Sequence, residues 1–345
     1  MKATTRRLGR ALLLAATSVA LVLVLATAFE RYATAEAWRR FPPRGVRIDV
    51  GGYRLHALCT GGGAPTVILE AGLWGTTEDW SLVQPEVARF TRVCSYDRAG
   101  MGYSDPGPQP RGVGDVVKDL HALLRGLDAP GPYLFTGHSL GGLYTRLHAA
   151  AHPRDTAGLV LVDSGHEDQF DRIPELGDLF RTQAASLRDE ARLASFGLLR
   201  AREAWRGGSL ALYRLSSLDR EAAVRFGIRL RPPGLNEAHR EMTSSEALRD
   251  QLRRTRATLD VPLVILTHGD DPLPGVAPLR MAAIESTWRE LQRDLLTLSP
   301  QGVQRVAETS GHYIQNQQPE LVVEAIRGII EKPARVLRSR PPDRR

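Results

Sequence analysis

The sequence has little lysine and lacks several patterns that mark particular classes of protein. Only three of its 46 basic residues are lysines, and no basic stretch is interleaved with aromatics, which argues against nucleic-acid binding despite a net charge of +7. No internal repeat is found. His148 and His152 lie four residues apart, but no Glu or third ligand accompanies them as a zinc motif requires. In contrast, 42% of the residues are hydrophobic, which excludes a disordered chain.

The N-terminus carries a long apolar run. Four basic residues precede the uncharged segment from Ala11 to Phe29, whose 19 residues can cross a bilayer core as a helix. A cleavable signal peptide usually has a shorter apolar region, although Ala26-Thr27-Ala28 resembles a cleavage site. The basic residues before the run favour a cytoplasmic N-terminus, and Arg31, Arg39 and Arg40 after it weaken that preference. We therefore expect an uncleaved anchor with the remaining chain facing outward, with cleavage and secretion as the alternative.

One stretch organises the remaining chain. An apolar run from Tyr133 stops at Gly137, and a helix-like run resumes at Leu140 after Gly-His-Ser-Leu-Gly, a G-x-S-x-G match. The pattern predicts a nucleophile elbow, in which a strand turns sharply into a helix and holds Ser139 at the apex. A strained backbone needs neighbours without a Cβ atom, and Gly137 and Gly141 meet that need.

Strand-like and helix-like segments alternate around this elbow, which predicts an α/β fold with a mostly parallel sheet covered on both faces. The helical, Arg/Glu/Ala/Leu-rich segment 165–259 interrupts the alternation and is expected to lie as a cap above the carboxyl ends of the strands. The expected parts are an anchor or signal segment 1–29, a linker 30–45, a core in two pieces (46–164 and 260–332), the cap 165–259, and a basic, disordered tail 333–345.

A serine nucleophile needs a base that is itself oriented by an acid. His312 lies in Ser310-Gly311-His312, in the loop after the last expected strand, where it can reach back over Ser139. Two positions compete for the acid. Asp270 and Asp271 follow the expected strand that ends near Thr267, and Asp163 ends the strand after the elbow. The oxyanion donors map to the backbone N–H groups of Leu140 and of Leu73, which follows the permissive Gly72.

Several motifs together give the chain a clear resemblance to the α/β-hydrolase fold superfamily, most of all to membrane-anchored bacterial α/β hydrolases of the esterase/haloperoxidase-like type. Two features depart from the usual pattern. Glu70-Ala71-Gly72 replaces the common His-Gly arrangement, and Pro272 stands three residues after Gly269 where relatives place the acid. The second departure favours Asp163 over Asp271. The resemblance rests on Leu69–Leu73, Tyr96–Asp105, Gly137–Gly142, Leu161–Ser164 and Ser310–His312.

The resemblance implies acyl transfer on a small-molecule ester or related acyl substrate, with no cofactor and no metal. A Ser nucleophile disfavours the dehalogenase and epoxide hydrolase branches, which use Asp. A lactonase or peptidase on the same triad is the alternative within this chemistry. A non-catalytic, membrane-tethered binding protein is the alternative from another class. The sequence leaves the natural substrate and the oligomeric state open.

The two cysteines are Cys59, late in the second expected strand, and Cys94, early in the strand that leads to Asp97. In the fold that the chain resembles, these strands are antiparallel neighbours, so the two residues face each other within disulfide reach. An outward-facing domain lies in an oxidising compartment, where such a bond persists. We therefore expect a Cys59–Cys94 disulfide, against the alternative of two buried, reduced thiols.

Overall fold

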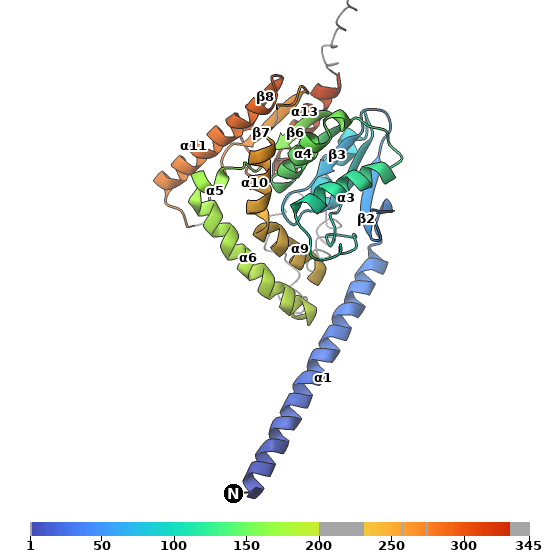
Figure 1. Ribbon diagram of the computed structural model, residues 1–345, viewed down its shortest axis with the longest axis vertical. Coiled ribbons are helices and arrows are strands. Elements are labelled where there is room, and N and C mark those ends of the chain that lie inside the picture. The colour runs from blue at the N-terminus through green and yellow to red at the C-terminus, as the bar shows by residue number, and fades with distance from the viewer. Residues whose placement is uncertain (1, 200–230, 257, 274, 332–345) are drawn as a thin grey trace, which may run out of the picture.

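The computed structural model describes residues 2–199, 231–256, 258–273 and 275–331. Its centre is an eight-stranded sheet in the order β1-β2-β4-β3-β5-β6-β7-β8, flanked by helices (Figure 1). Strand β2 runs antiparallel to β1 and β4, and the other neighbouring pairs are parallel. The predicted fold class is confirmed. The strands are β1 (Val46–Asp49), β2 (Arg54–Thr60), β3 (Val67–Glu70), β4 (Val93–Tyr96), β5 (Tyr133–His138), β6 (Thr156–Val162), β7 (Leu263–His268) and β8 (Gly302–Ala307).

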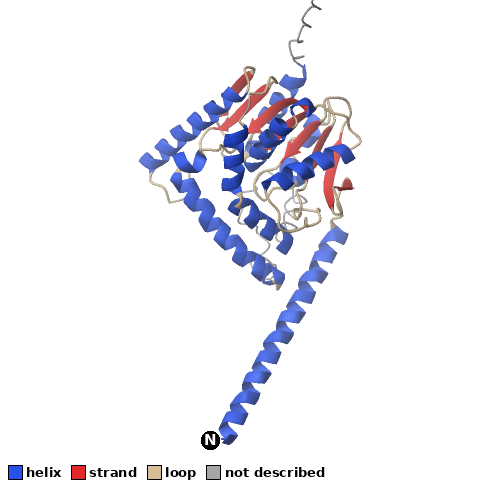
Figure 2. Ribbon diagram, in the orientation of Figure 1, coloured by secondary structure: helices blue, strands red, loops and turns tan. Residues whose placement is uncertain are grey.

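Helices cover both faces of the sheet (Figure 2). They are α1 (Lys2–Arg40), α2 (Gln84–Val87), α3 (Val113–Gly126), α4 (Leu140–Ala151), α5 (Gln169–Arg172), α6 (Pro174–Ser195), α9 (Pro232–Thr243), α10 (Ser245–Thr255), α11 (Pro278–Asp294), α12 (Ile314–Gln317) and α13 (Pro319–Glu331), with short 3₁₀ turns η1 (Thr77–Trp80), η2 (Pro153–Asp155) and η4 (Leu295–Leu298).

Strands β3, β5 and β7 are buried along their whole length, which explains their continuous apolar character. Successive side chains of a strand point to opposite faces, so the sheet has two cores. Phe135 packs with Leu120 of α3 on one face, whereas Leu134 packs with Ile326 of α13 on the other. These cores fix the carboxyl ends of β5, β6 and β7 side by side, with Val162 facing both His138 and Leu266 in the register.

The segment between β6 and β7 is helical, as its composition indicates. Helices α5, α6, α9 and α10 form what we call the insert, and residues 200–230 of the expected cap lie outside the described part of the chain. Helix α6 packs against α9 through Leu187, Leu235 and their neighbours, and this apolar cluster includes Trp74 and Met101 of the core. The insert is therefore joined to the core beside the loop that follows β3.

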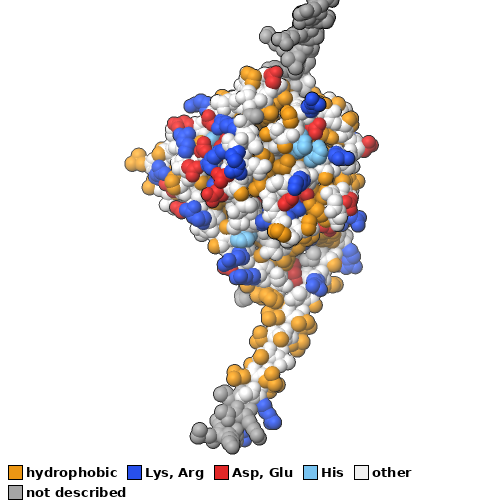
Figure 3. All heavy atoms as spheres, viewed as in Figure 1, with side chains coloured by type: hydrophobic (Ala, Val, Ile, Leu, Met, Phe, Trp, Pro, Cys, Tyr) orange, Lys and Arg blue, Asp and Glu red, His pale blue; other side chains and the backbone are white. Residues whose placement is uncertain are grey.

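Helix α1 extends away from the domain and presents apolar side chains along its length (Figure 3). Its segment Gly9–Glu36 is long and apolar enough to cross a membrane, a test that a signal sequence also passes. The structure differs from the expected linker at residue 30, because α1 continues to Arg40. Residues 30–40 contain no Gly or Pro, and the helix ends just before Pro42 and Pro43. The basic tail 333–345 lies outside the described residues.

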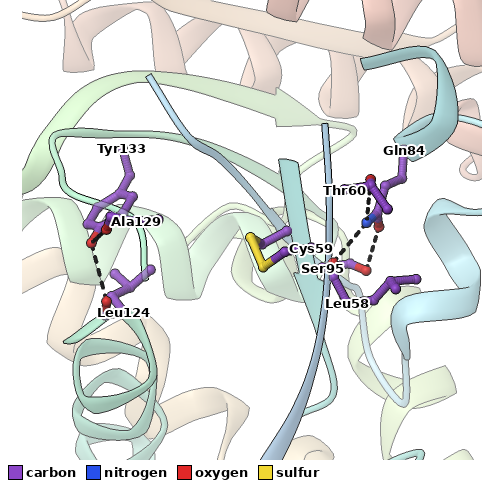
Figure 4. The surroundings of a disulfide bond; sticks show 9 residues. Leu58, Cys59, Thr60, Gln84, Ser95, Leu124, Ala129 and Tyr133 are labelled. Atoms are coloured by element: carbon purple, nitrogen blue, oxygen red, sulfur yellow. Dashed lines mark hydrogen bonds between the residues drawn. A yellow bond between two sulfur atoms is a disulfide. The ribbon is translucent and has the colours of Figure 1, made fainter. Parts of the chain in front are cut away.

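The predicted disulfide is confirmed. Cys59 of β2 and Cys94 of β4 face each other in the register, with a Cα–Cα distance of 4.1 Å and an S–S bond of 2.06 Å (Figure 4). The same strand pair is joined on its other side by Gln84, whose amide donates to the Leu58 carbonyl at 2.8 Å and accepts from Ser95 Oγ at 2.6 Å (Figure 4). A covalent bond and a side-chain bridge thus tie the antiparallel edge to the parallel sheet.

Candidate active site

Ser139 occupies the sharp turn between β5 and α4. Its backbone has φ 52° and ψ −120°, a conformation that costs an L-residue free energy and is held by its surroundings. A Cβ atom on Gly137 would lie 2.7 Å from the Gly141 carbonyl oxygen, and one on Gly141 would lie 2.4 Å from the Glu70 carbonyl oxygen. Both glycines are therefore required by close backbone approach, as the motif predicts.

His312 contacts Ser139 from the loop between β8 and α12. The distance from His312 Nε2 to Ser139 Oγ is 2.9 Å, and the distance from His312 Nδ1 to Asp163 Oδ2 is 2.6 Å. Because a carboxylate only accepts, Nδ1 donates to Asp163, which leaves Nε2 to accept the serine proton. The three side chains come from the carboxyl ends of three strands, β5, β6 and β8.

The structure brings Asp163, rather than the two aspartates of the loop after β7, into a hydrogen bond with His312. Asp163 is fully buried and follows β6 with φ 41°. Asp271 instead lies beside Gly311, and its N–H donates to Glu285 Oε1 at 3.2 Å. Burial alone would raise the pKa of Asp163, but His268 and His312 outweigh it and hold that pKa far below its usual range. The carboxylate is thus ionised.

His268, the last residue of β7, is a second imidazole on the same carboxylate, and the sequence did not single it out. Its Nδ1 lies 2.8 Å from Asp163 Oδ2 and its Nε2 lies 2.9 Å from Oε2 of Glu285 on α11. Burial favours the neutral ring, but the two carboxylates outweigh burial and raise the pKa of His268 to about 10. Trp288 Nε1 donates to the other oxygen of Asp163 at 2.9 Å. The signal in the sequence that could have identified His268 is its position at the end of a buried strand.

The two predicted oxyanion donors are backbone N–H groups at the start of α4 and in the loop after β3. The N–H of Leu140 belongs to the first turn of α4, where it has no acceptor within the helix. Leu73 follows Gly72 in the loop after β3, where a Cβ atom on Gly72 would lie 2.7 Å from His138 Nδ1 and 3.3 Å from Ser139 Cβ. This loop therefore approaches the nucleophile closely only because residue 72 is glycine.

A buried arginine holds the loop that follows β3 in place. Arg98 donates to the carbonyls of Ala71 at 2.7 Å and of Gly72 at 2.6 Å. It also pairs with Glu70 at 2.6 Å and with Glu241 of insert helix α9 at 2.5 Å, all three side chains being buried. Glu241 Oε2 in turn accepts from the N–H of Trp74 at 3.1 Å. The insert thus takes part in fixing the loop that carries Leu73, a role that the sequence did not reveal.

His138 supports the loop that carries His312. Its Nε2 lies 2.9 Å from the His312 carbonyl oxygen, so it donates there. Burial, followed by the proximity of His312, lowers the pKa of His138 to about 3, and the ring is therefore neutral. His138 thus supports the His312 loop as a neutral donor, and the base is His312.

A cavity of roughly 390 Å³ opens above Ser139 and His312. The insert and helix α11 supply half of its lining residues, and apolar atoms make up the larger part of its surface. Such walls suit a substrate whose non-reacting part is hydrophobic. The apolar lining residues are Leu73, Trp74, Leu176, Leu179, Phe180, Leu187, Met242, Leu273, Met281, Ile284 and Trp288.

Comparison with known proteins agrees with this fold. The chain is 26% identical over 268 residues to the uncharacterized protein YqjL of Bacillus subtilis, covering 77% of this chain and 83% of that protein. The enol-lactonase of Burkholderia xenovorans shares the fold with a TM-score of 0.61, 19% identity and coverage of 83% and 100%. Est816, an N-acyl homoserine lactone degrading enzyme, aligns with a TM-score of 0.58, 18% identity and coverage of 82% and 99%. A family model matches residues 67–325, and the chain belongs to the alpha/beta hydrolase family.

Proposed function

We propose that this protein is a serine hydrolase that cleaves a carboxylic ester or a related acyl substrate through Ser139, His312 and Asp163. One observation carries the proposal: His312 stands between the other two, with Nε2 2.9 Å from the serine oxygen and Nδ1 2.6 Å from the buried carboxylate. Family membership supports hydrolysis, and the identity of the nucleophile rests on this geometry.

The reaction runs in two steps. Ser139 Oγ attacks the substrate carbonyl carbon while His312 Nε2 takes its proton, and the resulting oxyanion lies against the N–H groups of Leu73 and Leu140. The C–O bond to the alcohol breaks as His312 returns the proton to the leaving oxygen. Water, deprotonated by His312, then attacks the carbonyl carbon of the acyl-enzyme; the bond to Ser139 Oγ breaks, His312 returns the proton to Oγ, and the acid is released. Asp163 remains ionised and stabilises the imidazolium that forms in each step.

His268 acts as a positioning residue in this scheme. It contacts neither substrate nor nucleophile, but it donates to the same carboxylate oxygen as His312 and is itself held by Glu285. Its positive charge offsets part of the attraction of Asp163 for a proton on His312. We infer that His268 sets the pH range in which His312 is available as the base.

The volume and lining of the cavity support a substrate class. A volume of roughly 390 Å³ lies at the small end of the range for ligand pockets, and its wall offers leucine, methionine and aromatic contacts. We infer esters with short or medium apolar acyl groups. The apolar α1 supports attachment to a bacterial cell membrane with the domain facing outward, and a cleaved N-terminus would instead release it.

A panel of p-nitrophenyl esters tests this substrate class. We expect turnover to rise from acetyl to medium chains and to fall for palmitoyl, with Ser139→Ala as the inactive matched control. Assays on simple lactones and peptide amides distinguish the proposed esterase activity from the lactonase and peptidase alternatives. Preference for either of those substrates over every ester would replace the proposed specificity while keeping the triad. A folded protein inactive on all of them would favour the binding-protein alternative.

A further inference from the structure

Three of the nine histidines of the chain gather far from Ser139, between helices α3 and α4. His148 and His152 lie four residues apart on one side of α4 and at its end, and His121 reaches them from α3. One ring nitrogen of each lies within 4.8 Å of the others. The fold thus provides the third imidazole that the local sequence around His148 lacks.

His148 is the unusual member of this histidine cluster. Its side chain is fully buried against Phe135, with ring centroids 4.8 Å apart, and neither ring nitrogen has a hydrogen-bond partner among the described residues. A buried polar group without a partner costs free energy and calls for an explanation. Its ring lies 4.8 Å from that of His152, and one of its nitrogens lies within 4.8 Å of a nitrogen of each of the other two imidazoles.

Burial favours the neutral form of His148 and His152, which is the form that binds metal ions. Burial, followed by the neighbouring His152 and His121, lowers the pKa of His148 to about 3. Burial, followed by His121, also lowers the pKa of His152. A carboxylate is close by, since Asp155 Oδ2 lies 4.0 Å from His121 Nδ1.

The site is accessible from solvent. His121 and His152 line a surface depression of about 500 Å³, together with Asp49, Lys118 and Arg125. Histidine side chains gather on the face of the molecule that α3 and α4 cover (Figure 3). The rings of His121 and His152 are only partly buried and stack on each other, with centroids 4.1 Å apart and 9° between their planes. An ion bonded at about 2.0–2.1 Å to each nitrogen requires nitrogens about 3.3 Å apart, so the proposal requires that these two exposed rings turn when the ion binds.

From this arrangement we propose that His121, His148 and His152 form a binding site for one divalent transition-metal ion of the zinc class. Imidazole suits Zn²⁺, Ni²⁺ and Cu²⁺, and two histidines four apart on a helix are a recurring chelating pair. The ion would join α3 to the C-terminal end of α4. Since His148 is nine residues beyond Ser139, roughly 13 Å along the helix, the site acts on stability and not on the reaction.

Zn²⁺ titration of the full chain by calorimetry tests the proposal, using untagged protein in detergent after removal of metal by a chelator. We expect one Zn²⁺ per chain with a Kd on the order of 10 μM or tighter at pH 7.5. His121→Gln and His152→Gln should each weaken binding at least tenfold. His239→Gln, a histidine of insert helix α9, is the matched control and should leave binding unchanged.

His148→Phe replaces the buried ring with one of similar shape and should also abolish tight binding. If that variant does not fold, the two partly exposed histidines decide the outcome. Binding weaker than about 1 mM overturns the proposal. So does tight binding that survives both His121→Gln and His152→Gln. A Zn²⁺ affinity lost in His312→Gln but not in His121→Gln would locate the ion at Asp163, His268 and His312, and would equally overturn it.

Discussion

Replacing His268 by asparagine tests how the active site sets its working pH. The asparagine amide can still donate to Asp163, as Nδ1 of His268 does at 2.8 Å, but it carries no charge. In the variant the Asp163 charge is no longer offset, so it attracts the proton on His312 more strongly. The acid limb of the kcat/KM profile must therefore move to higher pH.

The size of this shift follows from the geometry. His268 and His312 bond the same carboxylate oxygen at 2.8 and 2.6 Å, and each ring charge is spread over the imidazole beyond the bonding nitrogen, so the centres of the two charges lie roughly 6 Å apart. At an effective dielectric constant of about 20, two unit charges at that distance interact by about 2.8 kcal/mol, or about two pH units. Allowing for relaxation around the site, we expect a shift of about one to two units.

The assay is kcat/KM on a p-nitrophenyl ester between pH 5 and 10, with Trp288→Phe as the control. That variant removes a neutral donor at 2.9 Å from Asp163 without changing any charge, so its limb should move by less than about half a unit. An acid limb in His268→Asn that coincides with the wild-type limb would refute the assigned role of His268. An equal shift in both variants would show that a general disturbance around Asp163, rather than loss of the His268 charge, is responsible.

The remaining predictions concern stability, the acid, the disulfide and topology. The pKa of His268 is raised from 6.5 to about 10, so the stability that its charge contributes to the fold is complete below pH 6.5 and is lost as the pH rises toward 10. The Tm of the wild-type protein should therefore fall over that range more than the Tm of His268→Asn. Asp163→Asn should lower kcat on one ester by about 10⁴-fold, and Asp271→Asn should lower it by less than tenfold. The reverse order would show that Asp271 is the acid of the triad. Replacing Cys59 and Cys94 by serine, which opens a link between residues 35 apart, should cost about 4 kcal/mol in denaturant unfolding, and an unchanged midpoint would contradict this. A C-terminal reporter active only in the cytoplasm should stay silent, and a strong signal would reverse the orientation.

The parts of the site that the sequence predicted are those encoded locally. The elbow is readable because Gly137 and Gly141 must lack a Cβ beside a strained serine, and both stand within two residues of Ser139. His312 is readable from its place after the last strand. The Cys59–Cys94 pairing followed from a fold in which two antiparallel strands are neighbours, and the register places the two residues opposite each other.

The parts that the sequence did not predict depend on contacts between distant residues. His268 and Asp163 are 105 residues apart, and Arg98 and Glu241 are 143 apart. Each charged residue alone is compatible with an exposed position, and only the folded chain shows that these four are buried and paired. The extent of α1 was missed for a different reason, because a charged but Gly- and Pro-free segment permits a helix to continue beyond its apolar part.

The central claim is that Ser139 is a nucleophile activated by His312. Treating the full chain with a fluorophosphonate probe and mapping the modified peptide by mass spectrometry tests it most directly, because the probe forms a covalent bond only with an activated serine. We predict one equivalent of label on Ser139 of the wild-type protein and none on Ser139→Ala. The labelling rate of His312→Ala should be lower than that of the wild type by a factor on the order of 10³ or more. Circular dichroism should show that both variants are folded. A folded wild-type protein that takes up no label, or a Ser139→Ala variant that labels and hydrolyses esters at the wild-type rate, would contradict the account.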